Sequence, residues 1–172
     1  VPISQLNENQ LAAFRQKHIG FVFQSYNLLP ELTAAENVAM PLMFKGIDPD
    51  VRLLEAKKML CRVGLKDRMD HFPNQMSGGQ QQRVGIARAF VTHPEVVFAD
   101  EPTGNLDSKT TKEVMHMIRG FAHRFHQTIV LVSHDPEMTE YADRIVTLID
   151  GRIVSNVENQ VKAEIDAAPY IE

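Results

Sequence analysis

The chain has 172 residues, 44% of them hydrophobic, and its 22 acidic and 18 basic residues give a formal net charge of −4. That length provides one sizeable core and no room for two ordinary domains, and the acidic balance argues against a nucleic-acid partner, whose phosphates require a basic face. One cysteine, Cys61, excludes an internal disulfide, and without an export signal or an apolar run of roughly 20 residues we expect a cytoplasmic chain that does not insert into a membrane.

The first half of the chain predicts one strand followed by two helices. Residues His18–Phe23 form a short apolar run that is typical of a buried strand. A helix capped by Thr33 is predicted over Thr33–Phe44, and a second over Asp48–Arg62, where the Asp-Pro pair supplies a start signal. No predicted strand separates these two helices, so we expect them to lie together.

The second half of the chain alternates helices and strands. In order, these are a helix from Ser77 to before Pro94, a strand over Val96–Ala99, a helix from Asp107 or Ser108 to about Phe125, a strand over Thr128–Val132, a short helix over Pro136–Ala142 and a strand over Ile145–Ile149. Strands separated by helices favour a parallel sheet with right-handed crossovers, so the sequence predicts an α/β fold in which the four apolar runs form the sheet.

The end of the chain predicts a hairpin and a tail. Asp150-Gly151 is typical of a tight turn, here leading into a strand over Arg152–Ser155. Residues 157–172 are polar and lack a sustained period, so we expect a loosely ordered tail.

Polar side chains follow three of the predicted strands. Asp100 and Glu101 come at the end of the second strand, Gln24 directly after the first, and His134 after the third. Parallel α/β sheets bind ligands at their carboxyl edge, where these side chains would meet. Taken singly, each residue fits a solvated strand end or a turn. Their shared position favours a functional site.

A pair of glycines stands at the start of the helix that begins at Ser77. The run Met76-Ser77-Gly78-Gly79-Gln80 fits a capping box, in which the side chains of Ser77 and Gln80 bond to each other's backbone. A cap alone does not require two glycines. Gly78 and Gly79 leave a bare backbone that would let an anion, naturally a phosphate, reach the N–H groups at the positive end of the helix.

Five segments resemble, in the family's order, the motifs of the ATP-binding subunits of ABC-type transporters. They are the glutamine loop at Phe21–Gln24, the signature at Met76–Gln80, the Walker B strand at Val96–Pro102, the D-loop at Gly104–Asp107 and the histidine switch at Ser133–Asp135. One such match could arise by chance, whereas the ordered set identifies the family. Further matches at Ser25–Pro30 and Asp100–Asp107 are similar to the subgroup that serves macrolide export and lipoprotein release.

The resemblance implies ATP and Mg²⁺ as ligands. Asp100 would hold Mg²⁺ through water, Glu101 would polarise the attacking water, and Gln24 would sense the metal and that water. His134 would donate to the γ-phosphate. Asp107 would align the two halves of a homodimer or of a pair of ATPase subunits. The signature residues would bind ATP held by the second subunit; they are Ser77, Gly78, Gly79 and Gln80.

The resemblance also implies a membrane partner. A helical lobe, about residues 33–90 between the glutamine loop and the Walker B strand, resembles the part of the family that docks a transmembrane permease subunit. The segment after Gln24 would move as nucleotide comes and goes. The chain would then be peripheral on the inner face of the cell membrane.

One departure from the family concerns the Walker A loop that grips phosphates. The family carries G-x-x-x-x-G-K-[ST] upstream of the glutamine loop, and residues 1–24 contain no match. We therefore expect a partial P-loop NTPase-type sheet over residues 1–156 without the first strands and the Walker A loop, as in a shortened gene product, an expressed fragment or an alternative start. In the family the strand that leads into this loop lies between those matched by Thr128–Val132 and Ile145–Ile149, so the resemblance implies an open slot there.

Three functions compete at this point. The first is an ATPase subunit that drives a transporter, with doubtful activity for this chain alone. The second is a catalytically inactive fragment that only docks a partner subunit. The third is a soluble ABC ATPase of DNA repair or translation, for which we expect a long coiled-coil insertion or a second cassette, and the short spacing between Gln24 and Ser77 disfavours it.

Overall fold

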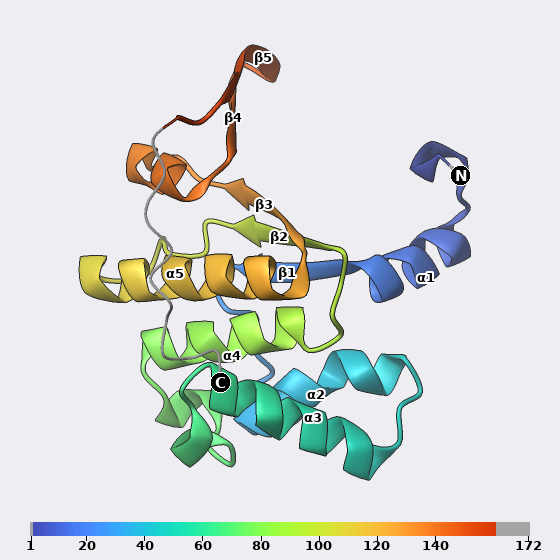
Figure 1. Cartoon of the computed structure of the whole chain (residues 1–172). Coiled ribbons are helices and arrows are strands. Elements are labelled where there is room, and N and C mark those ends of the chain that lie inside the picture. The colour runs from blue at the N-terminus through green and yellow to red at the C-terminus, as the bar shows by residue number, and fades with distance from the viewer. Residues whose placement is uncertain (1, 161–172) are drawn as a thin grey trace.

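The computed structural model describes residues 2–160 of the chain (Figure 1). The α-helices are α1 (Glu8–His18), α2 (Ala34–Phe44), α3 (Pro49–Arg62), α4 (Gly78–Phe90) and α5 (Ser108–Phe125). The strands are β1 (Ile19–Phe23), β2 (Val96–Asp100), β3 (Thr128–Val132), β4 (Arg144–Ile149) and β5 (Arg152–Glu158). Short 3₁₀ helices lie at Ile3–Gln5, Lys66–Arg68, Pro73–Gln75 and Pro136–Tyr141.

Strands β1, β2 and β3 form a parallel sheet in that order, which confirms the predicted α/β fold. The register places Phe23, Asp100 and Val132 side by side, so the three carboxyl ends stand at one edge of the sheet. Helices α4 and α5 lie against one face of this sheet, and α2 and α3 pack beyond α4 (Figure 1).

The hydrophobic core lies between the sheet and its helices. Val22 of β1 and Val97 of β2 are buried on this side, where they meet apolar side chains of α4 and α5. Phe90 of α4 and Phe121 of α5 are also buried, with ring centroids 5.3 Å apart. Alternate strand residues point into this core, so a slip of one residue would exchange the side chains of the two faces, and the register at the sheet edge depends on which side chains fit between the sheet and its helices.

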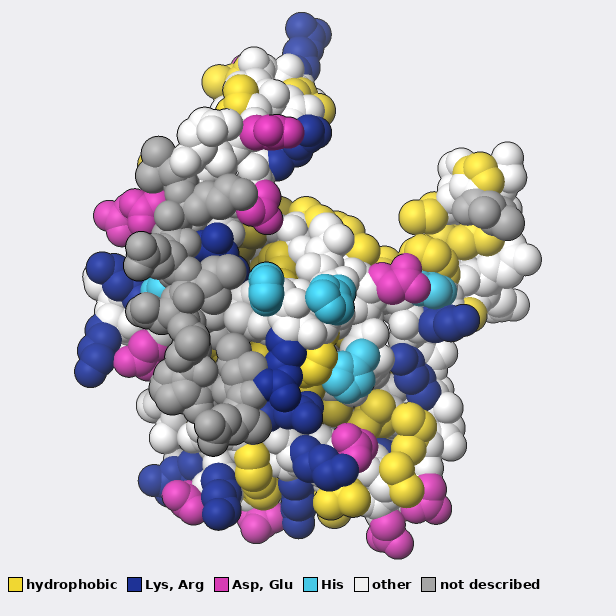
Figure 2. Space-filling view, in the orientation of Figure 1, with side chains coloured by type: hydrophobic (Ala, Val, Ile, Leu, Met, Phe, Trp, Pro, Cys, Tyr) yellow, Lys and Arg dark blue, Asp and Glu magenta, His cyan; other side chains and the backbone are white. Residues whose placement is uncertain are grey.

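The opposite face of the sheet is apolar and part-exposed. Phe21 stacks on Phe98 with ring centroids 5.6 Å apart and is 41% exposed. Val130 and Val132 of β3 are 38% and 53% exposed. Figure 2 shows hydrophobic side chains above the sheet, in the hollow between the β4–β5 hairpin and α1. Parallel sheets normally bury both faces, so contact of this face with water is costly.

The prediction of a four-stranded sheet is wrong for its last strand. β4 pairs with β5 in a separate antiparallel sheet rather than joining β1, β2 and β3. The predicted hairpin turn is confirmed, because Asp150 and Gly151 adopt φ values of 48° and 73° as a two-residue turn of this kind requires. The hairpin forms because β5 follows β4 directly, so that pairing closes only a very short loop.

Three other elements differ from the prediction. Helix α1 was not expected because none of its residues is buried, and its sequence signal is the capping box formed by Asn7 and Gln10. The segment Pro136–Tyr141 is a 3₁₀ helix rather than an α-helix. β5 extends to Glu158, into the range expected as a tail, and the part of that tail beyond residue 160 lies outside the described residues.

Candidate functional site

The carboxyl edge of the β1–β3 sheet gathers the polar residues that follow its strands. Asp100 ends β2, level with the last residues of β1 and β3. Gln24, Glu101 and His134 therefore leave the sheet from three neighbouring strands, as predicted. A polar cleft of about 530 Å³ borders Glu101 and His134 and extends over the start of α5.

Glu101 and His134 are bonded directly to each other at this edge. The Glu101 carboxylate accepts hydrogen bonds from His134 Nδ1 at 2.6 Å, from the His134 backbone N–H at 3.0 Å and from Ser133 Oγ at 3.2 Å. The backbone N–H of Glu101 donates to the carbonyl of Val132 at 2.9 Å, and its φ is 44°. A left-handed conformation in a residue with a Cβ persists where the surroundings enforce it, and such residues cluster at functional sites.

This pairing shifts the proton affinities of both groups. Burial alone would raise the pKa of Glu101, but the hydrogen bonds and the charge of His134, together with the bond from Ser133, hold it below the ordinary value. The hydrogen bond and the charge of Glu101 in turn raise the pKa of His134. At neutral pH Glu101 is therefore ionised, and His134 holds its proton more firmly than an isolated imidazole does.

The substitution Glu101→Gln is expected to return the pKa of His134 toward the ordinary value, because the amide carries no charge. Since the folded-state pKa is raised, the pair's contribution to stability is complete below the unfolded pKa of histidine and is lost as pH rises through the raised pKa. An NMR titration of His134 in the purified chain measures this. Glu95→Gln, at the other end of β2, should leave the titration unchanged. An identical His134 titration in the parent and in Glu101→Gln would contradict the pairing.

Gln24 packs against the turn that follows Glu101. Its backbone carbonyl accepts a hydrogen bond from Asn105 Nδ2 at 3.1 Å. A Cβ atom added to Gly104 would lie 2.5 Å from Gln24 Nε2, so a larger residue there would displace this amide. The segments that follow β1 and β2 are thus fitted to each other.

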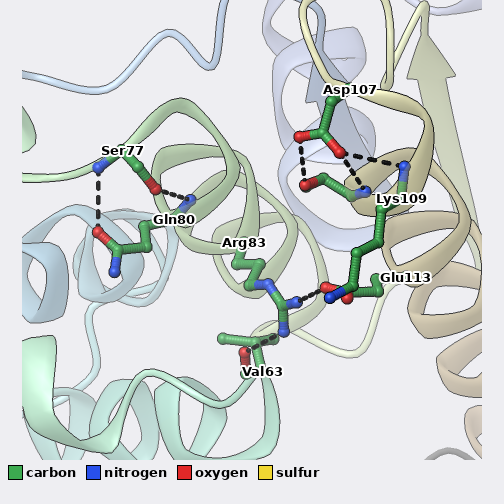
Figure 3. Close-up of polar contacts among 8 residues, drawn as sticks. Val63, Ser77, Gln80, Arg83, Asp107, Lys109 and Glu113 are labelled. Atoms are coloured by element: carbon green, nitrogen blue, oxygen red, sulfur yellow. Dashed lines mark hydrogen bonds and ion pairs between the residues drawn. The ribbon is translucent and has the colours of Figure 1, made fainter.

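The start of α4 is capped as predicted. Ser77 Oγ accepts from the Gln80 backbone N–H at 3.3 Å, and Gln80 Oε1 accepts from the Ser77 backbone N–H at 3.0 Å (Figure 3). One turn further along, Arg83 donates to the Val63 carbonyl at 3.2 Å and pairs with Glu113 of α5 at 2.6 Å. These contacts fix the first turns of α4 to α3 and α5.

The two glycines of α4 have a second structural reason that the sequence did not reveal. A Cβ atom added to Gly78 would lie 2.8 Å from the hydroxyl oxygen of Tyr26, and one added to Gly79 would lie 2.9 Å from Thr110 Cγ2. Both distances are too short for a real Cβ atom. The bare backbone therefore admits neighbouring side chains of the same chain, and anion binding at these glycines stays a prediction.

Asp107 is the N-cap of α5. Its carboxylate accepts hydrogen bonds from Thr110 Oγ1 at 2.7 Å, the Thr110 backbone N–H at 3.0 Å and the Lys109 backbone N–H at 3.1 Å (Figure 3). The bonds from Thr110 hold the pKa of Asp107 below its ordinary value. The role in aligning two subunits stays a prediction.

Two side chains that the sequence did not single out fix the segment after β1. Arg88 donates to the carbonyls of Tyr26 at 2.8 Å and Asn27 at 2.5 Å, two residues with φ values of 62° and 49°. Asn37 is fully buried and bonds to both the N–H and the carbonyl of Leu29. Asn37 lies in α2 and Arg88 in α4, and both helices are mainly apolar around these positions. The only sequence signal for either residue was a polar side chain between apolar ones.

A mainly apolar cleft of about 740 Å³ lies between α1, β1, α2 and α4. Its lining includes Ala12, Phe21, Met40 and Phe44, with Arg88 among the few polar members. Phe44 is 62% exposed. A concave apolar surface with a small number of polar groups is suited to binding a ligand or a protein segment.

The oxygen donors at the sheet edge suit Mg²⁺. Asp100 offers a carboxylate and Gln24 an amide oxygen, and Mg²⁺ is usually held by one or two carboxylates with phosphate and water completing its shell. Within residues 2–160 there is no group of three or more His, Cys, Asp or Glu that could cage a metal. Asp100 and Gln24 would supply two of the oxygen ligands of a bound Mg²⁺, and phosphate and water would supply the others.

Comparison with known proteins gives close matches. The ABC transporter family model matches residues 3–104. An uncharacterized ABC transporter ATP-binding protein of Methanocaldococcus jannaschii is 50% identical over 151 residues, which is 88% of this chain and 67% of that protein. The macrolide export ATP-binding/permease protein MacB of Pasteurella multocida is 47% identical over 154 residues, which is 90% of this chain and 24% of that protein.

The fold matches two solved structures. A dimeric structure of the post-hydrolysis state of an ATP-binding cassette bound to ADP and Pi has a TM-score of 0.80 at 40% identity, covering 90% of this chain and 68% of that chain. A dimeric structure of a bacterial ABC transporter cassette has a TM-score of 0.79 at 41% identity, covering 89% and 68%. Among the described residues, no helix combines the length and the apolar character needed to span a bilayer.

Proposed function

This chain belongs to the ABC transporter family, and we propose that it forms most of an ATP-binding and ATP-hydrolysing subunit that powers a transporter. The observation that carries the proposal is the direct Glu101–His134 pair beside Asp100 at the carboxyl edge of a parallel sheet. Phosphoryl transfer to water needs a positioned nucleophile and stabilisation of charge rather than covalent catalysis. The side chains at this edge can supply both.

In the proposed reaction each residue at the edge has one task. Glu101, held ionised by His134, orients the attacking water. His134 uses Nδ1 toward Glu101, which leaves Nε2 of its 84% exposed side chain to donate to the γ-phosphate. Asp100 and Gln24 would hold Mg²⁺, which neutralises phosphate charge when it is bound.

We propose that the signature residues act on ATP bound to a second copy of the subunit or to a paired one. The support is their place at the N-terminal end of α4, where the helix dipole and free N–H groups favour an anion. The two solved relatives are described as dimers, one of them with ADP and Pi. These residues are Ser77, Gly78, Gly79 and Gln80, with Asp107 aligning the two halves.

A transmembrane permease is the second proposed partner, with macrolide export or lipoprotein release as the proposed process. The Pasteurella multocida relative is named as an ATP-binding and permease protein for macrolide export. The apolar cleft beside α2, with exposed Phe44 at its rim, offers a surface for a permease segment. The lobe over about residues 33–90 would dock it, and the chain would be peripheral on the inner face of the cell membrane.

The test supplies the phosphate-binding loop that the 172 residues do not contain. A fusion protein, called the joined ATPase, places a family-like segment that carries G-x-x-x-x-G-K-[ST] before residue 1 of the chain. We expect it to be a Mg²⁺-dependent ATPase that dimerises around ATP. The 172-residue chain alone is the control. It should bind ATP far more weakly and show no appreciable hydrolysis, because it lacks the loop N–H groups and the Lys that cradle the phosphates.

Calorimetry and phosphate release distinguish the alternatives. A joined protein that binds ATP without hydrolysing it would favour an inactive subunit that only docks a partner. Micromolar ATP binding by the chain alone would contradict the expectation for the control. ATP hydrolysis that no permease stimulates would favour a soluble ABC ATPase over a transporter subunit.

A further inference from the structure

A glutamine inside α4 holds the turn that carries Glu101. Gln82 is fully buried, and its Nε2 donates to the carbonyl of Pro102 at 2.5 Å. Its Oε1 is buried without a hydrogen-bond partner among the described residues. Reversing the amide would place Oε1 against the Pro102 carbonyl oxygen, so the orientation is set by the contact itself. The contact with the Pro102 carbonyl therefore leaves Gln82 Oε1 buried without a partner among the described residues.

The Pro102 carbonyl lies immediately after Glu101 in a tight turn. The Glu101 backbone N–H donates to Val132 O at 2.9 Å, and Gly104 N donates to Glu101 O at 3.1 Å. On the far side of the turn, the buried Thr103 hydroxyl donates to the Met138 sulfur at 3.7 Å. These bonds hold the backbone on both sides of Glu101, whose φ is left-handed. The amide of Gln82, which lies in α4, holds the same turn through the Pro102 carbonyl.

We propose that Gln82 is a positioning residue for ATP hydrolysis, which rests on the function proposed above. Gln82 stands little more than one turn beyond Ser77, the residue that opens the signature. Helix α4 thus carries the signature at its start and, on the same rigid segment, the amide that holds the turn of Glu101. A signature that engages the partner's nucleotide is thereby linked mechanically to the chain's own Glu101 carboxylate.

The chain contains a matched control for this contact. Gln127 Nε2 donates to the carbonyl of Pro94 at 2.6 Å, and its Oε1 is likewise buried without a partner among the described residues. Pro94 precedes β2 and Pro102 follows it. Each end of β2 is therefore held by a glutamine amide on a proline carbonyl, but only the Gln82 contact adjoins Glu101.

The two variants Gln82→Met and Gln127→Met separate positioning from plain stability. Methionine keeps the length and approximate volume of the side chain and removes the donor, so both variants should lose stability for the same reason. In the joined ATPase, Gln82→Met should lower kcat on the order of 10- to 100-fold with little change in KM, because a small displacement of a catalytic group is costly. Gln127→Met should keep the parent kcat. Equal kcat in both variants would overturn the proposal.

Hydrogen exchange on the 172-residue chain gives a readout that does not depend on ATPase activity. Gln82→Met should speed exchange of the Gly104 amide, which closes the turn onto Glu101 O, by at least about tenfold relative to the parent. Gln127→Met should leave it unchanged. If the joined parent does not hydrolyse ATP, the proposed function has failed and the exchange comparison alone decides on the Gln82 contact.

A second variant covers a folding failure of Gln82→Met. Gln82→Asn keeps the amide but withdraws it by one methylene from Pro102, so it should reproduce both the faster Gly104 exchange and the lower kcat. Parent-like exchange and parent-like kcat in a folded Gln82→Asn would overturn the assignment.

Discussion

Replacing Glu101 by Gln in the joined ATPase should lower turnover by about 10²- to 10⁴-fold, the range expected for loss of a general base. The amide keeps the volume of the side chain, but it cannot accept a proton from water or hold His134 by charge. Because the groups that bind nucleotide remain, ATP-bound dimers should accumulate instead of turning over. Phosphate release and size-exclusion chromatography in the presence of ATP measure the two effects.

Glu95→Gln is the matched control for this substitution. Glu95 lies directly before β2, and Glu101 lies directly after it. The Glu95 carboxylate contacts His18 Nδ1 at 2.8 Å, and the Glu101 carboxylate contacts His134 Nδ1 at 2.6 Å. Because the Glu95 pair lies at the opposite edge of the sheet, the control should keep its turnover within about twofold of the parent. His134→Ala should lower turnover as Glu101→Gln does. Nearly unchanged hydrolysis in Glu101→Gln would remove Glu101 from the reaction.

Helix starts and the hairpin turn were predictable because their chemistry is local. Thr33, Asp48, Ser77 and Asp107 each accept a backbone hydrogen bond at the start of the helix that the sequence assigned to them. A cap depends on residues only two or three positions apart, so one short window of sequence contains all the information. The same holds for the Asp150-Gly151 turn.

The hairpin signal predicted that β4 pairs with β5, but side-chain pattern alone did not predict which strands join the parallel sheet. Thr128–Val132 and Ile145–Ile149 are similar apolar, β-branched runs, yet β3 pairs with β2 while β4 pairs with β5. Side-chain pattern shows that a segment is extended and partly buried, whereas the choice of partner depends on which other strands are available. Helix α1 escaped prediction for a related reason, since it buries no residue.

The polar residues at the carboxyl edge of the sheet were predictable, and the side chains that hold the neighbouring backbone were not. Strand ends gave Gln24, Glu101 and His134, because parallel strands bring their carboxyl ends together. Gln82 and Arg88 act on backbone carbonyls far away along the chain, at Pro102 and at the segment after β1. Such contacts are defined by three-dimensional packing, so no spacing in the sequence reveals them.

The isolated 172-residue chain is expected to self-associate through the unpaired edge of β3 and the exposed apolar side chains beside it. β3 ends the described parallel sheet, where Val130 and Val132 are 38% and 53% exposed, and Leu148 of β4 is 62% exposed. A five-residue strand buried between β3 and β4, with several apolar side chains at roughly 1.5–3 kcal/mol each, would contribute about 5–10 kcal/mol. That is comparable with the whole stability of a domain, about 5–15 kcal/mol. Unpaired edges of this kind recruit other strands, including those of a second chain.

Sedimentation at increasing protein concentration measures this association, and Val130→Lys should weaken it. A lysine on an edge strand must keep its charge in water, so it opposes stacking of another strand or sheet on β3. Val51→Lys on α3 is the control, because Val51 is 50% exposed and lies away from the strand edges. It should associate as the parent does. A dilute monomer that melts cooperatively and protects the amides of both β3 and β4 to the level of global unfolding would contradict the open slot, because protection of that kind requires a partner strand for each edge.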